Sequence, residues 1–180
     1  MTMRVSIGRP VRTAALAVAV FVVCAAQANV SVPPPRGADS PEQIRQLIRD
    51  GRYADAELAA RAFLAAAERA AGCESLETAR AIDLLVESLW RGGKSRRAGA
   101  LELAEEAITI RQKALGDSDP ELSDSLSHAG LVCGELGRHA DARRLLERAL
   151  VVATATHGDR DDRVARIHTG TPKTRAKTVE

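Results

Sequence analysis

The stretch Gly134–Gly158, GELGRHADARRLLERALVVATATHG, carries the pattern that decides the fold. Within it, Ala142, Leu146 and Ala149 recur at the spacing that places apolar residues on one face of a helix. Gly137 supplies a turn before this helix, and the last glycine of the stretch supplies its stop. The stretch therefore predicts a turn followed by one complete amphipathic helix.

The same arrangement recurs twice upstream. Gly51 and Gly72 are 21 residues apart, as are the turn and stop glycines of the quoted stretch, and Gly93 and Gly116 are 23 apart. Residues 107–116 reappear in outline 42 positions later. Repeats of this length indicate a solenoid, in which each unit buries its apolar face against the next. Because no strand-like alternation persists after residue 40, we expect an all-α protein.

We expect three helix–turn–helix units and the beginning of a fourth. The units are expected to cover residues 40–72, 76–116, 120–158 and, in part, 159–168. Within them we expect a first helix that ends at Asp50–Gly51, helices at about 53–71, 76–91 and 97–115, a helix from Asp119–Pro120, and the helix of the quoted stretch. Residues 169–180 have almost nothing to bury, so we expect a disordered tail.

Residues 1–28 show the features of a secretory signal peptide in their usual order. Residues 1–12 carry three arginines and no acid, residues 14–26 are an unbroken apolar run, and Ala26-Gln27-Ala28 fits a cleavage site. We therefore expect a bacterial protein that is exported to the periplasm or secreted, with an uncleaved membrane anchor as the alternative. The proline-rich residues 29–39 should form an extended spacer.

The composition favours close-packed helices and argues against nucleic-acid binding. Aromatic residues make up only 2% of the chain and alanine is abundant, which disfavours a sheet or an aromatic-lined catalytic cavity. Removing the three leader arginines from the 26 basic residues leaves 23 against 24 acidic ones, a net charge of −1. Such a balance provides no basic surface for nucleic acid.

Two local patterns resemble chemical sites, and each has a structural explanation. Residues 92–95, GGKS, resemble the end of a phosphate-binding loop, but Ser88 stands where that motif needs a glycine, on a helix rather than after a strand. Asp117, Asp119 and Asp124 begin like a cation-binding loop but lack its glycine and terminal glutamate. An inter-helix turn and a helix cap explain these patterns better.

The remaining reactive side chains show no catalytic or ligand pattern. Cys133 is expected to be a small core residue, and a disulfide with Cys73 is an alternative in an oxidising compartment. We predict no catalytic residue, no cofactor and no metal, and therefore no enzyme. The histidines fall on different expected elements without ligand spacing: His128, His139, His157 and His168.

The second and third units resemble the tetratricopeptide (TPR) repeat, whose paired helices approach closely at small residues. The third unit offers Leu126, Ala129-Gly130 and Cys133, then Ala142, Leu146 and Ala149. The second offers Ile82, Leu85-Val86 and Leu89, then Ala100, Ala104 and Ala107. Val86 departs from the pattern, because it replaces the small residue. The 42-residue period and residues 104–142 look like the kinesin-light-chain type of repeat.

The resemblance implies a right-handed, all-α, TPR-type solenoid of about three repeats over residues 40–168. It also implies a non-enzymatic adaptor or scaffold that binds a protein or peptide partner in a concave groove lined by the first helices. The partner is expected not to be nucleic acid, and a membrane only if the leader is retained. The alternative is an N-terminal fragment of a larger TPR protein that lacks its effector domain, for example a CHAT caspase-like protease.

By the same resemblance, eleven residues take the groove positions. Trp90 is the only tryptophan, and a tryptophan beside an arginine is frequent at binding hot spots. The alternative is that Trp90 only packs under the turn and that the charges form a solvated face. The expected groove residues are Arg45, Arg49, Arg80, Asp83, Glu87, Trp90, Arg91, Asp124, Ser127, Leu131 and Glu135.

Overall fold

The computed structural model describes residues 40–96, 99–158, 164, 165 and 167. These residues form six α-helices and one short 3₁₀ helix and contain no strand, which confirms the predicted all-α class. The leader, the spacer and the tail that the sequence predicts lie outside the described residues. The helices are α1 (Pro41–Arg49), α2 (Tyr53–Ala71), α3 (Leu76–Arg91), α4 (Ala100–Leu115), η1 (Gly116–Ser118), α5 (Leu122–Glu135) and α6 (His139–His157).

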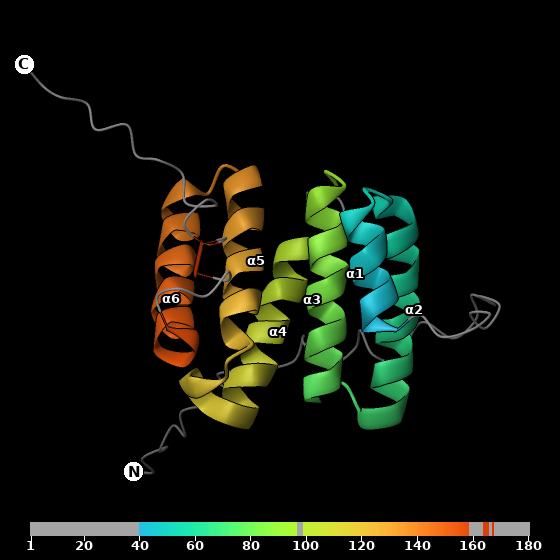
Figure 1. Ribbon diagram of the computed structural model, residues 1–180, viewed down its shortest axis with the longest axis horizontal. Coiled ribbons are helices and arrows are strands. Elements are labelled where there is room, and N and C mark those ends of the chain that lie inside the picture. Colours follow the sequence, from blue (N-terminus) through green and yellow to red (C-terminus); the bar gives the residue numbers. More distant parts are fainter. Residues whose placement is uncertain (1–39, 97–98, 159–163, 166, 168–180) are drawn as a thin grey trace, which may run out of the picture. The chain divides into compact units, whose positions relative to one another are not determined.

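The helices are arranged as consecutive antiparallel pairs, α1 with α2, α3 with α4, and α5 with α6 (Figure 1). Each helix packs against the next one along the chain, and the first helices α1, α3 and α5 are also neighbours. In Figure 1, α4 lies behind α3 and α5. No described helix is long and apolar enough to cross a membrane. The described units therefore form a helical solenoid, with α1, α3 and α5 along one face.

The helix ends follow the chemistry that the sequence predicts. Ser40 Oγ accepts a hydrogen bond from the Gln43 backbone N–H at 3.3 Å, and Gln43 Oε1 accepts one from the Ser40 N–H at 3.2 Å. This capping box starts α1. The second helices end at Gly72, Gly116 and Gly158, whose φ values of 89°, 72° and 83° suit glycine.

Two helices begin later than predicted. The helix expected from residue 97 begins at Ala100, because Gly99 adopts a left-handed conformation with φ 62°. The helix expected from Asp119–Pro120 begins at Leu122. Asp119 has extended backbone, and its Oδ1 accepts a hydrogen bond from the Glu121 N–H at 2.9 Å. Asp119 therefore caps the turn before α5, as predicted for a capping role, but it lies outside the helix itself.

The third unit contains the close helix contact that the sequence predicts. A Cβ added to Gly130 would lie 2.8 Å from Leu146 Cγ and 3.3 Å from the Ala142 carbonyl oxygen. In the second unit the corresponding positions hold Val86 and Ala104, both fully buried. At this contact, the second and third units thus each combine one larger and one small side chain across their two helices.

Residues of the expected fourth unit contribute to the core. Val164 and Ile167 are buried and belong to the same apolar cluster as the six helices. The segment around them is otherwise outside the described residues. The described part of the fourth unit therefore adds two buried apolar residues to the core.

Candidate partner-binding groove

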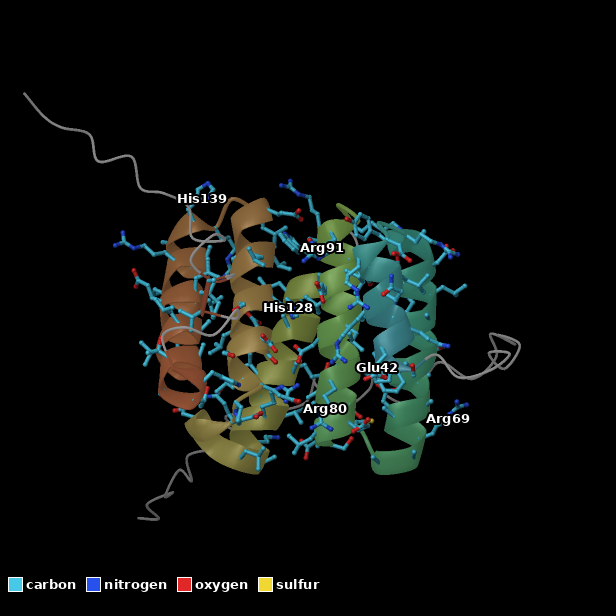
Figure 2. All side chains as sticks on the ribbon, viewed as in Figure 1. Glu42, Arg69, Arg80, Arg91, His128 and His139 are labelled. Carbon is cyan, nitrogen blue, oxygen red and sulfur yellow. The ribbon has the colours of Figure 1, made fainter. Side chains whose placement is uncertain are left out.

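A hollow of about 720 Å³ runs across α1, α3 and α5. Its lining also includes Tyr53 at the start of α2, Arg111 from α4, Leu146 from α6 and Ile167. Figure 2 shows Arg80, Arg91 and His128 on this face of the helices. The hollow contains ten of the eleven predicted groove residues, namely Arg45, Arg49, Arg80, Asp83, Glu87, Trp90, Arg91, Asp124, Ser127 and Leu131.

Glu135, the eleventh predicted residue, lies elsewhere. It is the last residue of α5 and lines a separate, smaller hollow of about 250 Å³ beside the turn at Gly93 and Ser95. Its place at the helix end directs it toward the inter-helix turns and away from the main hollow. The structure thus brings ten of the predicted residues together and separates one. Their role as partner contacts remains a prediction.

The floor of the groove contains a buried arginine that the sequence analysis missed. Arg111 is 2% exposed and donates from Nη2 to Asp83 Oδ2 at 2.8 Å and from Nε to Ser125 Oγ at 3.0 Å. Its Nη1 donates to Asp119 Oδ2 at 3.2 Å and to Glu121 Oε2 at 2.8 Å. The guanidinium therefore connects α3, α4, α5 and the turn before α5. The sequence feature that could have revealed Arg111 is its position three residues after Ile108, which puts a charged residue on the apolar stripe of α4.

The buried cluster keeps its charges. Burial alone would lower the pKa of Arg111, but the neighbouring carboxylates of Asp83 and Glu121 outweigh it and raise the pKa. Burial would likewise raise the pKa of Glu121, but hydrogen bonds from Arg80 and Arg111 outweigh it and lower the pKa. Both shifts favour the ionised forms, so the cluster is a charged connection between the second and third units.

The rim of the groove is lined by paired charges. Arg80 donates from Nε to Glu121 Oε2 at 2.9 Å, and Arg91 donates from Nε to Glu87 Oε1 at 2.9 Å. The Arg91 guanidinium also lies 5.2 Å from the centre of the Trp90 ring, within the range of a cation–π contact. Trp90 is half-buried, packs against the core and lines the hollow. Trp90 therefore packs against the core, as the alternative interpretation expects, and also lines the groove.

The α1 side of the groove presents two exposed arginines. Arg45 makes a long ion pair with Glu42 at 3.4 Å, and Arg49 donates from Nε to the Gln46 side-chain oxygen at 3.2 Å. Both partners belong to the same helix, and exposed pairs of this kind contribute little to stability. The arginine heads are therefore available to a binding partner at small cost.

His128 and Asp83 face each other across the floor of the groove. His128 Nδ1 and Asp83 Oδ1 are 3.8 Å apart, and neither atom hydrogen-bonds to any described residue. Burial alone would lower the pKa of His128, but Asp83, Glu87 and Asp124 outweigh it and raise the pKa. The sequence analysis assigned His128 no ligand role. Its position four residues after Asp124 was the signal that it shares the groove face.

The other sequence candidates do not form a chemical site. Residues 92–95 form a turn, as predicted, and Lys94 Nζ binds Glu57 Oε2 at 2.7 Å. The three aspartates diverge, because Asp117 pairs with Arg148 while Asp119 joins the buried cluster. Among the described residues, no group of three or more histidine, cysteine or acidic side chains is placed to hold a metal ion.

The other described histidines and cysteines do not line the hollow. His139 is exposed at the start of α6, and Figure 2 shows it at the top of that helix. His157 is the last residue of α6, and His168 lies outside the described residues. Cys133 is 1% exposed in α5, and burial raises the pKa of its thiol, which fits the predicted core role. Cys73 lies in the loop between α2 and α3.

Antiparallel helix pairs with a groove along their first helices define a helical repeat protein. Residues 95–155 match the family model described as tetratricopeptide repeat. Twenty-seven chains of solved structures match this chain; one is a Podospora anserina protein described as a kinesin light chain with nearly identical TPR-like repeats. The TM-score is 0.59 at 19% sequence identity, over 72% of this chain and 64% of the Podospora chain. The present chain therefore spans less than two thirds of the length of that protein.

The predicted recognition is confirmed to this extent: residues 95–155 match the tetratricopeptide repeat, and the fold is similar to that of a kinesin light chain with TPR-like repeats. At this sequence identity the structural likeness shows the fold alone. Comparison with curated proteins gives no match. Tetratricopeptide repeats suggest a protein-interaction module, and this repeat fold is generally not catalytic.

Proposed function

We propose that the protein is an adaptor that binds an extended segment or a helix of a partner protein in the groove across α1, α3 and α5. The observation that carries the proposal is the continuous hollow of about 720 Å³, which gathers ten residues predicted independently from the sequence. A hollow of this size accommodates several side chains. The half-buried Trp90 and the arginines around it supply the residue types that dominate protein interfaces.

The proposal is tested by partner recovery with matched charge reversals. Arg49→Glu with Arg91→Glu changes two exposed groove residues, and Arg69→Glu with Arg143→Glu makes the same change in net charge outside the groove. Figure 2 shows Arg69 pointing away from the helices. We expect affinity purification from the native cell extract to lose the partner with the groove pair and to keep it with the outer pair.

Trp90 provides a second test of the same surface. Trp90→Ala with Arg91→Glu removes the aromatic ring and reverses its neighbour, and circular dichroism checks that the helices remain. We expect this pair to lose the partner as well, because aromatic anchors at interfaces contribute about 2 kcal/mol or more. Equal recovery of the partner by the wild-type protein, this variant and the variant with Arg49→Glu and Arg91→Glu would contradict the assignment of the groove as the partner surface.

We also propose that the protein acts after export, on the basis of the leader sequence alone. The arginines, the apolar run and the cleavage motif of residues 1–28 support the proposal. Cell fractionation with N-terminal sequencing tests it. We expect a mature chain that begins at Asn29 in the periplasm or the medium. A chain recovered from the membrane with its leader intact would support the anchored alternative instead.

A further inference from the structure

The floor of the groove contains two polar atoms without a hydrogen-bond partner among the described residues. They are Asp83 Oδ1 and His128 Nδ1, and both residues line the hollow. Asp83 is only 8% exposed. A buried polar atom without a hydrogen bond is costly, so a ligand group that supplies one gains free energy on binding.

The free oxygen of Asp83 is held in place by the rest of its carboxylate. The other oxygen, Oδ2, accepts hydrogen bonds from Arg111 Nη2 at 2.8 Å and from Ser125 Oγ at 3.0 Å. These two donors come from α4 and α5 and fix the carboxylate between them. A carboxylate oxygen only accepts hydrogen bonds, so Oδ1 is a fixed, buried acceptor in the floor of the groove.

The spacing of the two atoms fits one shared donor. At 3.8 Å, His128 Nδ1 is too far from Asp83 Oδ1 for a direct hydrogen bond. A single N–H-bearing head group placed between them reaches both atoms, provided that the imidazole is neutral and its Nδ1 accepts. The two buried atoms can therefore share one small donor.

The charges around these two atoms favour a cation. Glu87 from α3 and Asp124 from α5 act on His128 together with Asp83, and Arg111 from α4 faces the opposite oxygen of that carboxylate. The residue that α6 contributes to the hollow is Leu146, which is apolar. Arg91 is held away by Glu87 and by the Trp90 ring. The charged groups that act most strongly on His128 are thus acidic.

We propose that Asp83 and His128 form a subsite for one cationic side chain of the partner segment, a lysine ammonium or an arginine guanidinium, which donates to Asp83 Oδ1 and to neutral His128 Nδ1. This subsite rests on the proposed function of the groove and adds the chemistry of one partner residue to it. It also separates the two ends of the groove, because the α1 side presents Arg45 and Arg49.

The same geometry makes the subsite sensitive to pH. A protonated His128 carries its own N–H and positive charge in the position that the ligand cation requires. The neighbouring carboxylates raise the pKa of His128 above its ordinary value of 6.5, so this competition extends above that pH. By linkage, the affinity for the cation falls about tenfold for each pH unit below the pKa of His128.

Two small probes test the subsite without knowledge of the partner. Nα-acetyl-lysine N-methylamide carries the ammonium, and Nα-acetyl-norleucine N-methylamide is its uncharged analogue. The readout is the NMR signal of the His128 ring in the full chain, assigned with His128→Gln. We expect the lysine probe to shift this signal saturably above the pKa of His128 and to lower that pKa, while the norleucine probe does neither.

A variant locates the effect. Asp83→Asn removes the carboxylate charge and should abolish the response to the lysine probe, whereas Arg69→Gln on α2, outside the groove, should leave it intact. Circular dichroism establishes that Asp83→Asn is folded, and the comparison of the two probes on the wild-type protein needs no variant. An equal response to both probes, or none to the lysine probe, would overturn the subsite.

The outcomes separate the subsite from the proposed function. If the lysine probe fails while the groove charge reversals still remove the partner, the groove binds its partner by other contacts. If the lysine probe binds while those reversals leave partner recovery unchanged, the subsite exists but the groove is not the partner surface.

Discussion

The second and third units solve the same packing problem with opposite side chains. In the third unit Gly130 on α5 lies against Leu146 on α6, and the corresponding positions of the second unit hold Val86 on α3 and Ala104 on α4. The small residue has moved from the first helix of the unit to the second. Packing density is thus a property of the pair of positions. A repeat pattern that considers each position separately marks Val86 as a departure from the expected small residue, although Ala104 on the facing helix compensates for its size.

The two units differ again in what they bury on the second helix. Arg111 of α4 corresponds to Ala153 of α6, 42 residues later, and both are buried. Arg111 reaches from the second unit into the third through Asp119, Glu121 and Ser125. The junction between these two units is therefore held by charge as well as by apolar contact. The same junction forms the floor of the groove.

Replacing the buried arginine gives the largest expected effect. Arg111→Ala introduces the residue of the third unit at this position and leaves Asp83 and Asp119 buried without their cation. Breaking a buried ion pair in this way typically costs about 3–5 kcal/mol of unfolding free energy. Urea denaturation followed by circular dichroism measures it. Arg143→Ala, which breaks an exposed pair with Glu147, should change stability by less than about 1 kcal/mol.

Exchanging the packing pair gives a smaller effect. Gly130→Val places side-chain atoms against Leu146 and should cost about 1–3 kcal/mol through overpacking. Adding Leu146→Ala reproduces the second unit's combination and should recover part of that loss, as a double-mutant cycle measures. Gly134→Ala is the control on the same helix, because a Cβ there meets no atom within 4 Å. An additive cycle, with no recovery in the double variant, would contradict the paired exchange.

The smallest expected effect concerns the stability of the fold at low pH, to which Glu121 contributes. Arg80 and Arg111 lower the pKa of Glu121 in the folded protein, so its ionised form stabilises the fold above its ordinary pKa of 4.5. This contribution is lost as the pH falls from about 4.5 through the lowered pKa. Glu121→Gln should flatten the dependence of the urea midpoint on pH below 4.5 without changing its slope near neutrality. An unchanged slope below pH 4.5 would show that the cluster does not shift Glu121.

The sequence predicted the repeats because they depend on local signals. Turn glycines, caps and apolar spacing are read within one helix pair, and the observed α2 and α3 begin and end where those signals place them. The later start of α4 depends on the backbone of Gly99, which no spacing rule specifies. The exclusion of Glu135 from the main hollow depends on the turn at Gly93, from another unit.

The chemistry of the groove floor was harder to predict, because it joins residues far apart in the chain. Ser125 meets Asp83 over 42 positions, and Arg111 meets Asp83 over 28. No single helix shows that a carboxylate, a guanidinium and an imidazole converge. The visible signs were a charged residue on an apolar stripe and the spacing of His128 after Asp124, and neither identifies the partners that neutralise the buried charge.

The most direct test of the account is crosslinking and mass spectrometry of the protein in its native cell. The account predicts that partner crosslinks map to residues bordering the groove on α1, α3 and α5, and that Arg49→Glu with Arg91→Glu removes them. Crosslinks that map to the outer surfaces of α2, α4 and α6 and survive this pair of substitutions would contradict the account.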